Sequence, residues 1–300
     1  MARGGGSGGP DGLALVDKDA AWTSHDVVAK ARGVLGTRKV GHSGTLDPDA
    51  TGLLLLGVGR VTRLLRFLGL GPKRYTGTVV LGTATSTLDA SGEVTGTWDM
   101  RSVDGGAVRE AAAALTGDQL QIPPMVSAVH VDGRRLHELA REGKEVEREP
   151  RPVTVHELLV HGEVAPGEYA IEVSCSAGTY VRSLAADLGT ALGGGAHLRD
   201  LRRTAIGSFS VADAVPVEAL TVEGLRTPAE AMRDLEAVTV DAAGAAAVGH
   251  GRKLAVAELG TSGPGPWALL DGDGELLAVY ERHRDGTAKP SVVLAAPPAP

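Results

Sequence analysis

Apolar residues along the chain follow two kinds of spacing, and each kind predicts a different element. Between residues 25 and 35 they share one face at the period of a helix, with Ser24 placed to cap the first turn. Similar reasoning predicts helices over 107–115, over 134–141 and from about residue 180. We therefore expect helices in these four places.

Elsewhere the apolar residues alternate with polar ones or run on without a break, which predicts strands. The block 53–56 is continuous, so we expect it to be buried. The sequence WALLDGDGELLAVYER places two apolar runs around an Asp-Gly turn signal and predicts a hairpin. Further strands are expected over 13–16, 73–82, 153–160, 169–176 and the run SVVLAA near the C-terminus.

The composition fits a chain that folds around a substantial core. Hydrophobic residues make up 43% of its 300 residues, a length that suits one large domain or one with a small companion. No apolar run is long enough for a membrane helix, and residues 1–12 lack the apolar region of a secretory signal. Cys175 is the only cysteine, so no internal disulfide or cysteine-based zinc site can form. We expect a disordered tail over 1–12 and a cytoplasmic protein.

Charge is distributed unevenly along the chain. The net charge is −7, yet residues 21–80 hold nine basic and three acidic residues, whereas residues 211–300 hold seven basic and thirteen acidic ones. Arg60, Arg63 and Arg66 recur every three residues on one helical side, either as a solvated face or as phosphate contacts. A basic part that binds nucleic acid and an acidic part near the C-terminus are therefore compatible with the negative total.

One stretch, GHSGTLDPDATGLLLLGVGR at residues 41–60, combines features that rarely occur together. Small and polar residues lead to Asp47, which stands between Leu46 and Pro48 and precedes an apolar block. Pro48 fixes its own φ and biases Asp47 away from helical backbone, so the carboxylate is presented on a rigid extended loop. The segment is either a solvated turn or a loop that holds a catalytic nucleophile or base.

Other candidate residues have a structural interpretation beside the functional one. His42 can bond to the backbone of the loop that carries Asp47. Tyr75 is one of four tyrosines and can be an ordinary core residue. Arg182 follows a strand and a Gly turn, where it can form a salt bridge without functional weight. These residues do not define a site by themselves.

Several ordered motifs of the chain resemble those of the TruB family of tRNA pseudouridine synthases. The longest, HSGTLDPDATGLL followed by GRVTR, contains Asp47. The others are KRY, QIPPMVSAVHVDGRRLHELAREG, GTYVR and GAHLRDLRRTAIGSFSV, and the resemblance extends over roughly the first two thirds of the chain. The chain departs from the family pattern at Asp19, Ala21, Ser86, His130 and His137.

The resemblance implies a role for each matching residue. Asp47 is the expected catalytic residue, and Asp89 matches a family acid near the base pocket. The residues expected to bind the substrate nucleotide are His42, Tyr75, Tyr180, Arg182 and Leu201. The residues expected to contact the RNA backbone are Arg60, Arg63, Arg202 and Arg203.

The resemblance also implies a fold and a reaction. We expect an α+β pseudouridine synthase fold, with a mixed, mainly antiparallel sheet flanked by helices over 13–230 and a small β-rich PUA-like domain over 231–300. The expected enzyme is a monomer that isomerises uridine-55 in the T loop of tRNA to pseudouridine. No cofactor, metal, protein partner or membrane is expected. The alternatives are a non-catalytic RNA-binding protein or tRNA-folding chaperone on the same scaffold, and a guide-RNA-dependent synthase.

Overall fold

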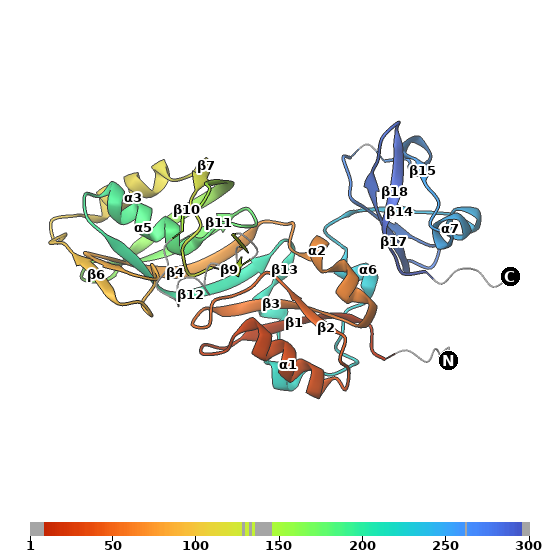
Figure 1. The fold of residues 1–300 in the computed structure, drawn as a ribbon, viewed down its shortest axis with the longest axis horizontal. Helices are drawn as coiled ribbons and strands as arrows, with labels where there is room; N and C mark the ends of the chain where they lie inside the picture. Colours follow the sequence, from red (N-terminus) through yellow and green to blue (C-terminus); the bar gives the residue numbers. More distant parts are fainter. Residues whose placement is uncertain (1–8, 128–129, 132–133, 136–145, 262, 296–300) are drawn as a thin grey trace.

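A nine-stranded mixed sheet runs through the larger part of the molecule (Figure 1). The computed structural model describes residues 9–127, 130–131, 134–135, 146–261 and 263–295. All neighbouring strands of this sheet are antiparallel except β3 and β12, which are parallel. The main path across it is β1 (Gly12–Lys18), β3 (Thr51–Val58), β12 (Ala196–Ile206), β4 (Lys73–Leu81), β11 (Glu168–Cys175), β10 (Arg151–Ala165) and β7 (Gly117–Gln121). Two short strands extend it, since β2 (Val40–Ser43) pairs with β3 and β13 (Phe209–Ser210) pairs with β12.

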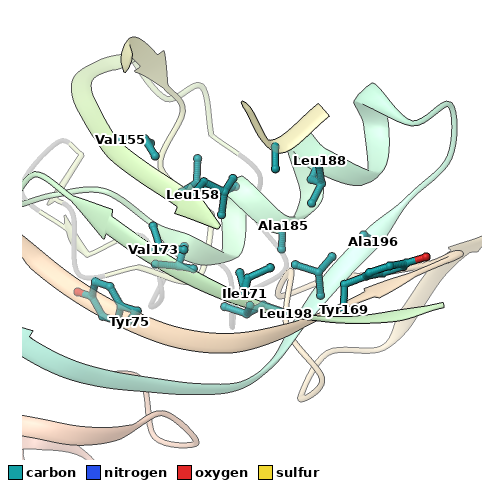
Figure 2. Close-up of a cluster of buried hydrophobic side chains, with 14 of the residues drawn as sticks. Tyr75, Val155, Leu158, Tyr169, Ile171, Val173, Ala185, Leu188, Ala196 and Leu198 are labelled. Atoms are coloured by element: carbon teal, nitrogen blue, oxygen red, sulfur yellow. The ribbon is translucent and has the colours of Figure 1, made fainter. Parts of the chain in front are cut away.

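Helices cover two regions of this sheet. The helices α3 (Gly105–Ala114) and α5 (Val181–Ala191) pack on β10 and β12, respectively, and on each other. Figure 2 shows the buried cluster between α5 and the strands β4, β10, β11 and β12, with Tyr75 at one end of it. The helix α1 (Ser24–Val34) buries Val27, Val28 and Ala31 in a second cluster with β1 and β3. The helices predicted over 25–35, 107–115 and from residue 180 are therefore confirmed.

The first helix is capped by a residue other than the one expected. Thr23 is the N-cap, and it forms a reciprocal capping box with Asp26. Ser24 is buried instead, and its hydroxyl accepts a hydrogen bond from the Leu46 N–H at 3.0 Å. The helix predicted over 134–141 lies mostly outside the described residues, and its first two residues form the strand β9 (Arg134–Arg135), paired with β8 (His130–Val131).

Short 3₁₀ and α segments connect the strands. The arginine stripe lies on η1 (Gly59–Leu64) and α2 (Leu65–Leu68), a 3₁₀ turn that continues into one α-helical turn. The strands β5 (Thr83–Thr85) and β6 (Val94–Thr97) form a separate two-stranded sheet. The remaining short elements are η2 (Val211–Asp213), η3 (Val217–Ala219) and α6 (Pro228–Ala231).

A five-stranded sheet with its own core forms the C-terminal part of the chain. Its order is β14 (Glu236–Thr239), β16 (Trp267–Leu270), β17 (Leu276–Arg282), β18 (Thr287–Val293) and β15 (Leu254–Ala255), accompanied by α7 (Ala242–Gly249) and η4 (Val256–Leu259). The predicted hairpin around the Asp-Gly turn is confirmed as β16 and β17. The fold is thus a mixed α+β domain followed by a small β-rich one, as expected.

The two parts lie next to each other beside α2 and α6 (Figure 1). They share one buried apolar cluster. Leu13 and Leu15 of β1 belong to the same buried cluster as Val279 and Leu294 of the small domain. The expected boundary at residue 231 falls at the end of α6, shortly before the second sheet begins. At the other end, Gly12 begins β1, so the last residue of the expected tail is part of the fold; residues 1–8 lie outside the described residues.

Candidate active site

Asp47 stands on the loop that joins β2 to β3, and this loop is bonded to the body of the domain at several points. The Ala50 N–H donates to the Asp47 carbonyl at 3.1 Å, which closes a tight turn around Pro48. Ser24 of α1 bonds to the backbone of Leu46, the residue before Asp47. These bonds hold in place the loop that presents the Asp47 carboxylate.

Two buried cations hold the same loop through its carbonyl groups. The Lys18 ammonium donates to the carbonyls of Asp19, Trp22 and Pro48 at 2.7 to 2.9 Å, and the residue is 1% exposed. Burial lowers the pKa of Lys18 to about 8. Three accepting carbonyls satisfy all three donors of an ammonium, so Lys18 stabilises the Asp47–Pro48 turn through a fully bonded, buried charge.

Arg203 is the second buried cation that bonds to this loop, and this corrects its expected role. Its guanidinium donates to the carbonyls of Gly44 and Leu53, each at 2.8 Å, and the residue is 1% exposed. A side chain so enclosed cannot reach the phosphates of a bound RNA. Its partners are backbone carbonyls, which no sequence pattern identifies, so the burial of Arg203 could not be predicted from the sequence.

The other arginines expected to contact RNA are partly or fully exposed but already have partners within the protein. Arg202 forms a two-pronged ion pair with Asp17, at 3.0 and 2.7 Å. Arg60 pairs with Asp11 and donates to the Leu294 carbonyl at 3.0 Å. The remaining two members of the arginine stripe also bond to the small domain, Arg63 to the Val293 carbonyl at 2.8 Å and Arg66 to Glu281 at 2.8 Å. The stripe therefore joins the two domains, and its contact with RNA stays a prediction.

The carboxylate of Asp47 forms an ion pair with Arg182, which lies at the start of α5. The Nε atom of Arg182 is 2.9 Å from Oδ2 of Asp47, and its Nη2 atom is 3.2 Å from Oδ1. The same guanidinium donates to the carbonyls of Thr87 at 2.7 Å and Val126 at 2.9 Å, and Asp89 lies 3.6 Å away. Arg182 is 3% exposed, so this two-pronged geometry is fixed from all sides.

Opposing effects act on the protonation of Asp47. Burial raises its pKa above the ordinary carboxyl value, the Arg182 guanidinium opposes this rise, and the Asp89 carboxylate adds to it. The Asp47 side chain is still 40% exposed, so the group faces a solvent-filled space and is not sealed in the core. A paired carboxylate at the mouth of a cavity can act as nucleophile, as base or as a fixed negative charge.

Two cavities meet at this ion pair. The larger, of about 340 Å³, has Asp89 and Leu198 in its wall, and the smaller, of about 250 Å³, has Tyr75 and Tyr180. Asp47, Arg182 and Leu201 line both. The structure thus brings together five of the residues proposed for chemistry and substrate binding, although they come from four separate segments of the chain.

A β-bulge directs Leu201 toward these cavities. The pairing of β12 with β4 shifts register between Arg199 and Arg202, and Asp200 has a left-handed φ of 55°. A bulge bends its strand and redirects the neighbouring side chains. Leu201 therefore lines both cavities instead of continuing the regular alternation of β12.

The aromatic wall of the smaller cavity is equally well fixed. Tyr75 lies opposite Val173 and Arg203 in the sheet and is 7% exposed, and burial raises the pKa of its hydroxyl. Gln121 makes two bonds to the backbone of Tyr180: its side-chain oxygen accepts from the N–H at 2.7 Å, and its amide donates to the carbonyl at 3.2 Å. Both rings are thereby held beside Asp47.

His42 is the one residue proposed for chemistry or for binding the substrate nucleotide that neither cavity includes in its described wall. Its ring lies edge-on to His25, with 5.4 Å between the ring centroids, and its Nδ1 atom has no hydrogen-bond partner among the described residues. Burial, with His25 and Arg203 as further causes, lowers the pKa of His42. Its expected contact with RNA stays a prediction.

Sequence reasoning did not identify the residues that hold the site together. Lys18, Ser24 and Gln121 act through backbone groups of distant segments, and a buried lysine has no pattern of its own. Lys73, at the start of β4, lines the smaller cavity and was not singled out for chemistry. Within the described residues, no three His, Cys, Asp or Glu side chains are grouped as metal ligands would be, and no helix is long and apolar enough to cross a membrane.

Comparison with known proteins places these features in a family. Residues 32–181 match the model of the TruB family pseudouridylate synthase N-terminal domain, and residues 182–238 match the tRNA pseudouridylate synthase B C-terminal domain. The chain is 46% identical to the tRNA pseudouridine synthase B of Thermobifida fusca (strain YX), over 95% of this chain and 99% of that one. Identity to the protein of the same name from Rhodococcus jostii (strain RHA1) is also 46%, over 95% and 94% of the two chains.

Solved structures share the fold. A chain of a Cbf5-Nop10-Gar1 complex superposes with a TM-score of 0.74 at 25% identity, covering 95% of this chain and 85% of that one. A chain from an H/ACA RNP bound to a substrate RNA containing 2′-deoxyuridine superposes with a TM-score of 0.71 at 22% identity, covering 96% and 86%. At that identity, the second likeness concerns the fold alone.

Proposed function

The chain belongs to the TruB family of pseudouridylate synthases and is an isomerase that makes pseudouridine in tRNA; on this premise we propose that its target is uridine-55 in the T loop and that Asp47 is the catalytic residue. The observation that carries this proposal is the ion pair of Asp47 with Arg182, placed where two cavities meet. A protein that only binds RNA does not need a carboxylate held in place by a buried arginine, and this argues against the non-catalytic alternative.

The reaction sets clear demands on such a site. The bond between N1 of uracil and C1′ of the ribose breaks, the base rotates, and a bond between C5 and C1′ forms, with a proton lost from C5 and one gained at N1. No electrons are transferred to or from another molecule, so the isomerisation itself requires no redox cofactor. The base must first leave the stack of the folded loop, at a cost of a few kcal/mol.

The geometry supports a role for each wall of the site. Tyr75 and Tyr180 line the smaller cavity beside Asp47, where an extruded base can stack on an aromatic ring. Leu201 offers an apolar surface to the same base. Arg182 favours the ionised form of the Asp47 carboxylate and fixes its orientation, and Asp47 then acts on the sugar or on the base.

The decisive experiment compares Asp47→Asn with wild-type enzyme on an unmodified tRNA transcript. The amide is neither nucleophile nor base, so the variant should bind tRNA with unchanged affinity and form no pseudouridine in single turnover. Asp99→Asn, which alters an exposed carboxylate paired with Arg101, is the matched control and should retain full activity. Pseudouridine formed by Asp47→Asn at near wild-type rate would refute the catalytic assignment.

The target position is tested with the RNA alone. A transcript in which the uridine at position 55 is replaced by cytidine should yield no pseudouridine, whereas an isolated T-arm stem-loop should be modified almost as well as whole tRNA. A stem-loop that cannot form its stem should be a poor substrate, because proteins of this kind recognise folded loops and splayed bases. Activity on bare transcript also separates this enzyme from one that needs a guide RNA.

A further inference from the structure

Lys73 places an ammonium group in the wall of the smaller cavity, where no other described residue bonds to it. The residue begins β4, two positions before Tyr75, and shares this wall with Asp47 and Arg182. It is partly buried. Among the residues that the structure describes, its Nζ atom makes no hydrogen bond and no ion pair. Lys18, by contrast, has three carbonyl acceptors for its ammonium.

A second cation lies close to Lys73. A Cβ atom placed on Gly44 would be 3.2 Å from Nζ of Lys73 and 3.5 Å from Nη1 of Arg203, so both charges lie over the same backbone position. Among the described residues, Arg203 bonds to backbone carbonyls and to the Tyr75 hydroxyl, and none of these partners is an anion. The pKa of Lys73 is lowered to about 8, mainly by burial and secondly by the charge of Arg203. The Cys175 thiol has the opposite effect on this pKa. Lys73 is therefore still largely protonated at neutral pH.

The cavity consequently carries an excess of positive charge. Asp47 is the only carboxylate in its described wall, and Arg182 already pairs with it. Lys73 therefore adds a positive charge that no carboxylate of the described wall meets, and Arg203, which does not itself line the cavity, lies close to it. Partly buried charges are costly unless an opposite charge meets them, so a wall of this composition is suited to an anionic group brought by the ligand.

We propose that Lys73 is a substrate-binding residue that receives a phosphate of the RNA backbone beside the nucleotide held in the smaller cavity. The inference rests on the proposed function, because tRNA is the ligand that brings the anion. The phosphodiester is the anionic group of an RNA strand, and a lysine binds it as a point charge. A uracil carbonyl is neutral and would leave the excess charge uncompensated.

The first test replaces the charge in the full-length protein. Lys73→Met should raise the Kd for a T-arm stem-loop about tenfold, as expected for one charged contact. It should reduce the slope of log K against log salt by about 0.7 to 0.9. Lys73→Arg should retain most of the affinity, and the single-turnover rate of both variants at saturating RNA should stay within about twofold of wild type, since a phosphate contact is made equally in the ground and transition states.

Arg109→Met is the matched control, because it removes one charge from an exposed position on α3, outside both cavities. It should change neither Kd nor the salt slope. Thermal unfolding of each variant shows that the comparison is made between folded proteins. An unchanged Kd and salt slope for Lys73→Met would overturn the proposal, as would a loss of rate at saturation without a loss of affinity.

The second test identifies the phosphate. Stem-loops are made with one neutral methylphosphonate linkage at a time around the target uridine. One linkage should weaken binding to wild-type enzyme about tenfold and leave binding to Lys73→Met unchanged, because the two changes remove the same contact. If every linkage weakens both proteins equally, Lys73 does not bind phosphate. Failure of the proposed function is seen separately, as absence of pseudouridine with wild-type enzyme and the unmodified stem-loop.

Discussion

Replacing Arg182 by methionine tests whether the ion pair that aims Asp47 also stabilises the fold. Methionine keeps an unbranched apolar stem and removes the guanidinium. The change leaves the carbonyls of Thr87 and Val126 without a donor, and it leaves Asp47 and Asp89 as neighbouring carboxylates without a cation between them.

The magnitude follows from these four contacts. Removing one partner of a fully buried pair costs about 3–5 kcal/mol, and each orphaned carbonyl costs about 1 kcal/mol or more. The Asp47 side chain is 40% exposed, so water compensates part of its lost pairing. We expect the free energy of unfolding to fall by about 3–4 kcal/mol. Because a domain has about 5–15 kcal/mol of stability, the variant should still fold.

This loss should depend on pH in a defined direction. The pKa of Asp47 is already raised in the folded state, and Arg182 is the main opposing influence, so its removal raises this pKa further. A carboxyl whose folded pKa lies above its unfolded value stabilises the fold fully below the unfolded pKa and loses that contribution as pH rises through the folded one. Arg182→Met should therefore be less destabilised at pH 5 than at pH 8.

The assay is urea unfolding followed by circular dichroism at both pH values, with single-turnover pseudouridine formation measured in parallel. Arg182→Met should lose about 10²-fold in rate, because the carboxylate is no longer aimed. Combining it with Asp47→Asn should restore part of the stability, giving less loss than the two single changes added together. Arg101→Met, which breaks an exposed pair with Asp99, should change stability little. Additive losses with no pH dependence would refute the reasoning.

Three further outcomes are expected. Gly52→Ala should destabilise the fold by at least about 1–3 kcal/mol, measured by urea unfolding, because Gly52 has a φ of 100° and its Cβ would lie 2.2 Å from the Arg203 carbonyl oxygen. The acid limb of kcat/KM should have an apparent pKa above the ordinary 3.8 of an aspartate, since the ionised Asp47 is required and its pKa is raised; a limb at or below 3.8 would contradict this. Deleting residues 231–300 should lower the free energy of unfolding of the remaining domain by about 5 kcal/mol or more, because each large apolar side chain that it uncovers contributes roughly 1.5–3 kcal/mol. The truncated chain should therefore show a lowered Tm or fail to stay soluble.

The two domains are less independent of each other than the sequence suggests. The acidic balance and the thinning resemblance after residue 231 mark a second domain, but they do not show what it covers. In the structure Leu276, Val279 and Leu294 share a core with Leu13 of the first strand. Contacts between residues almost three hundred positions apart leave no signal in one sequence.

The sequence alone determined most of the local structure and the place of the chemistry. Alternation and helical spacing predicted the strands β1, β4, β10 and β11 of the main sheet and the helices α1, α3 and α5, because each element buries one face. The motif around Asp47 predicted a rigid loop, because Pro48 restricts the backbone angles and the small residues permit a tight turn. Both effects are independent of the surrounding structure. Even so, adjacent Thr23 and Ser24 are both good caps, and only burial of Ser24 against Leu46 decided between them.

The tertiary structure alone decided which charges face the substrate. Asp47 and Arg182 are 135 positions apart in the chain, and their pairing requires α5 and the β2–β3 loop to meet. Arg203 was expected at the surface and is buried, whereas Lys73 drew no prediction and lines the cavity. The reason is physical: a charged side chain lies wherever carbonyls, carboxylates or water satisfy it, and the positions of those partners are set only when distant segments pack together.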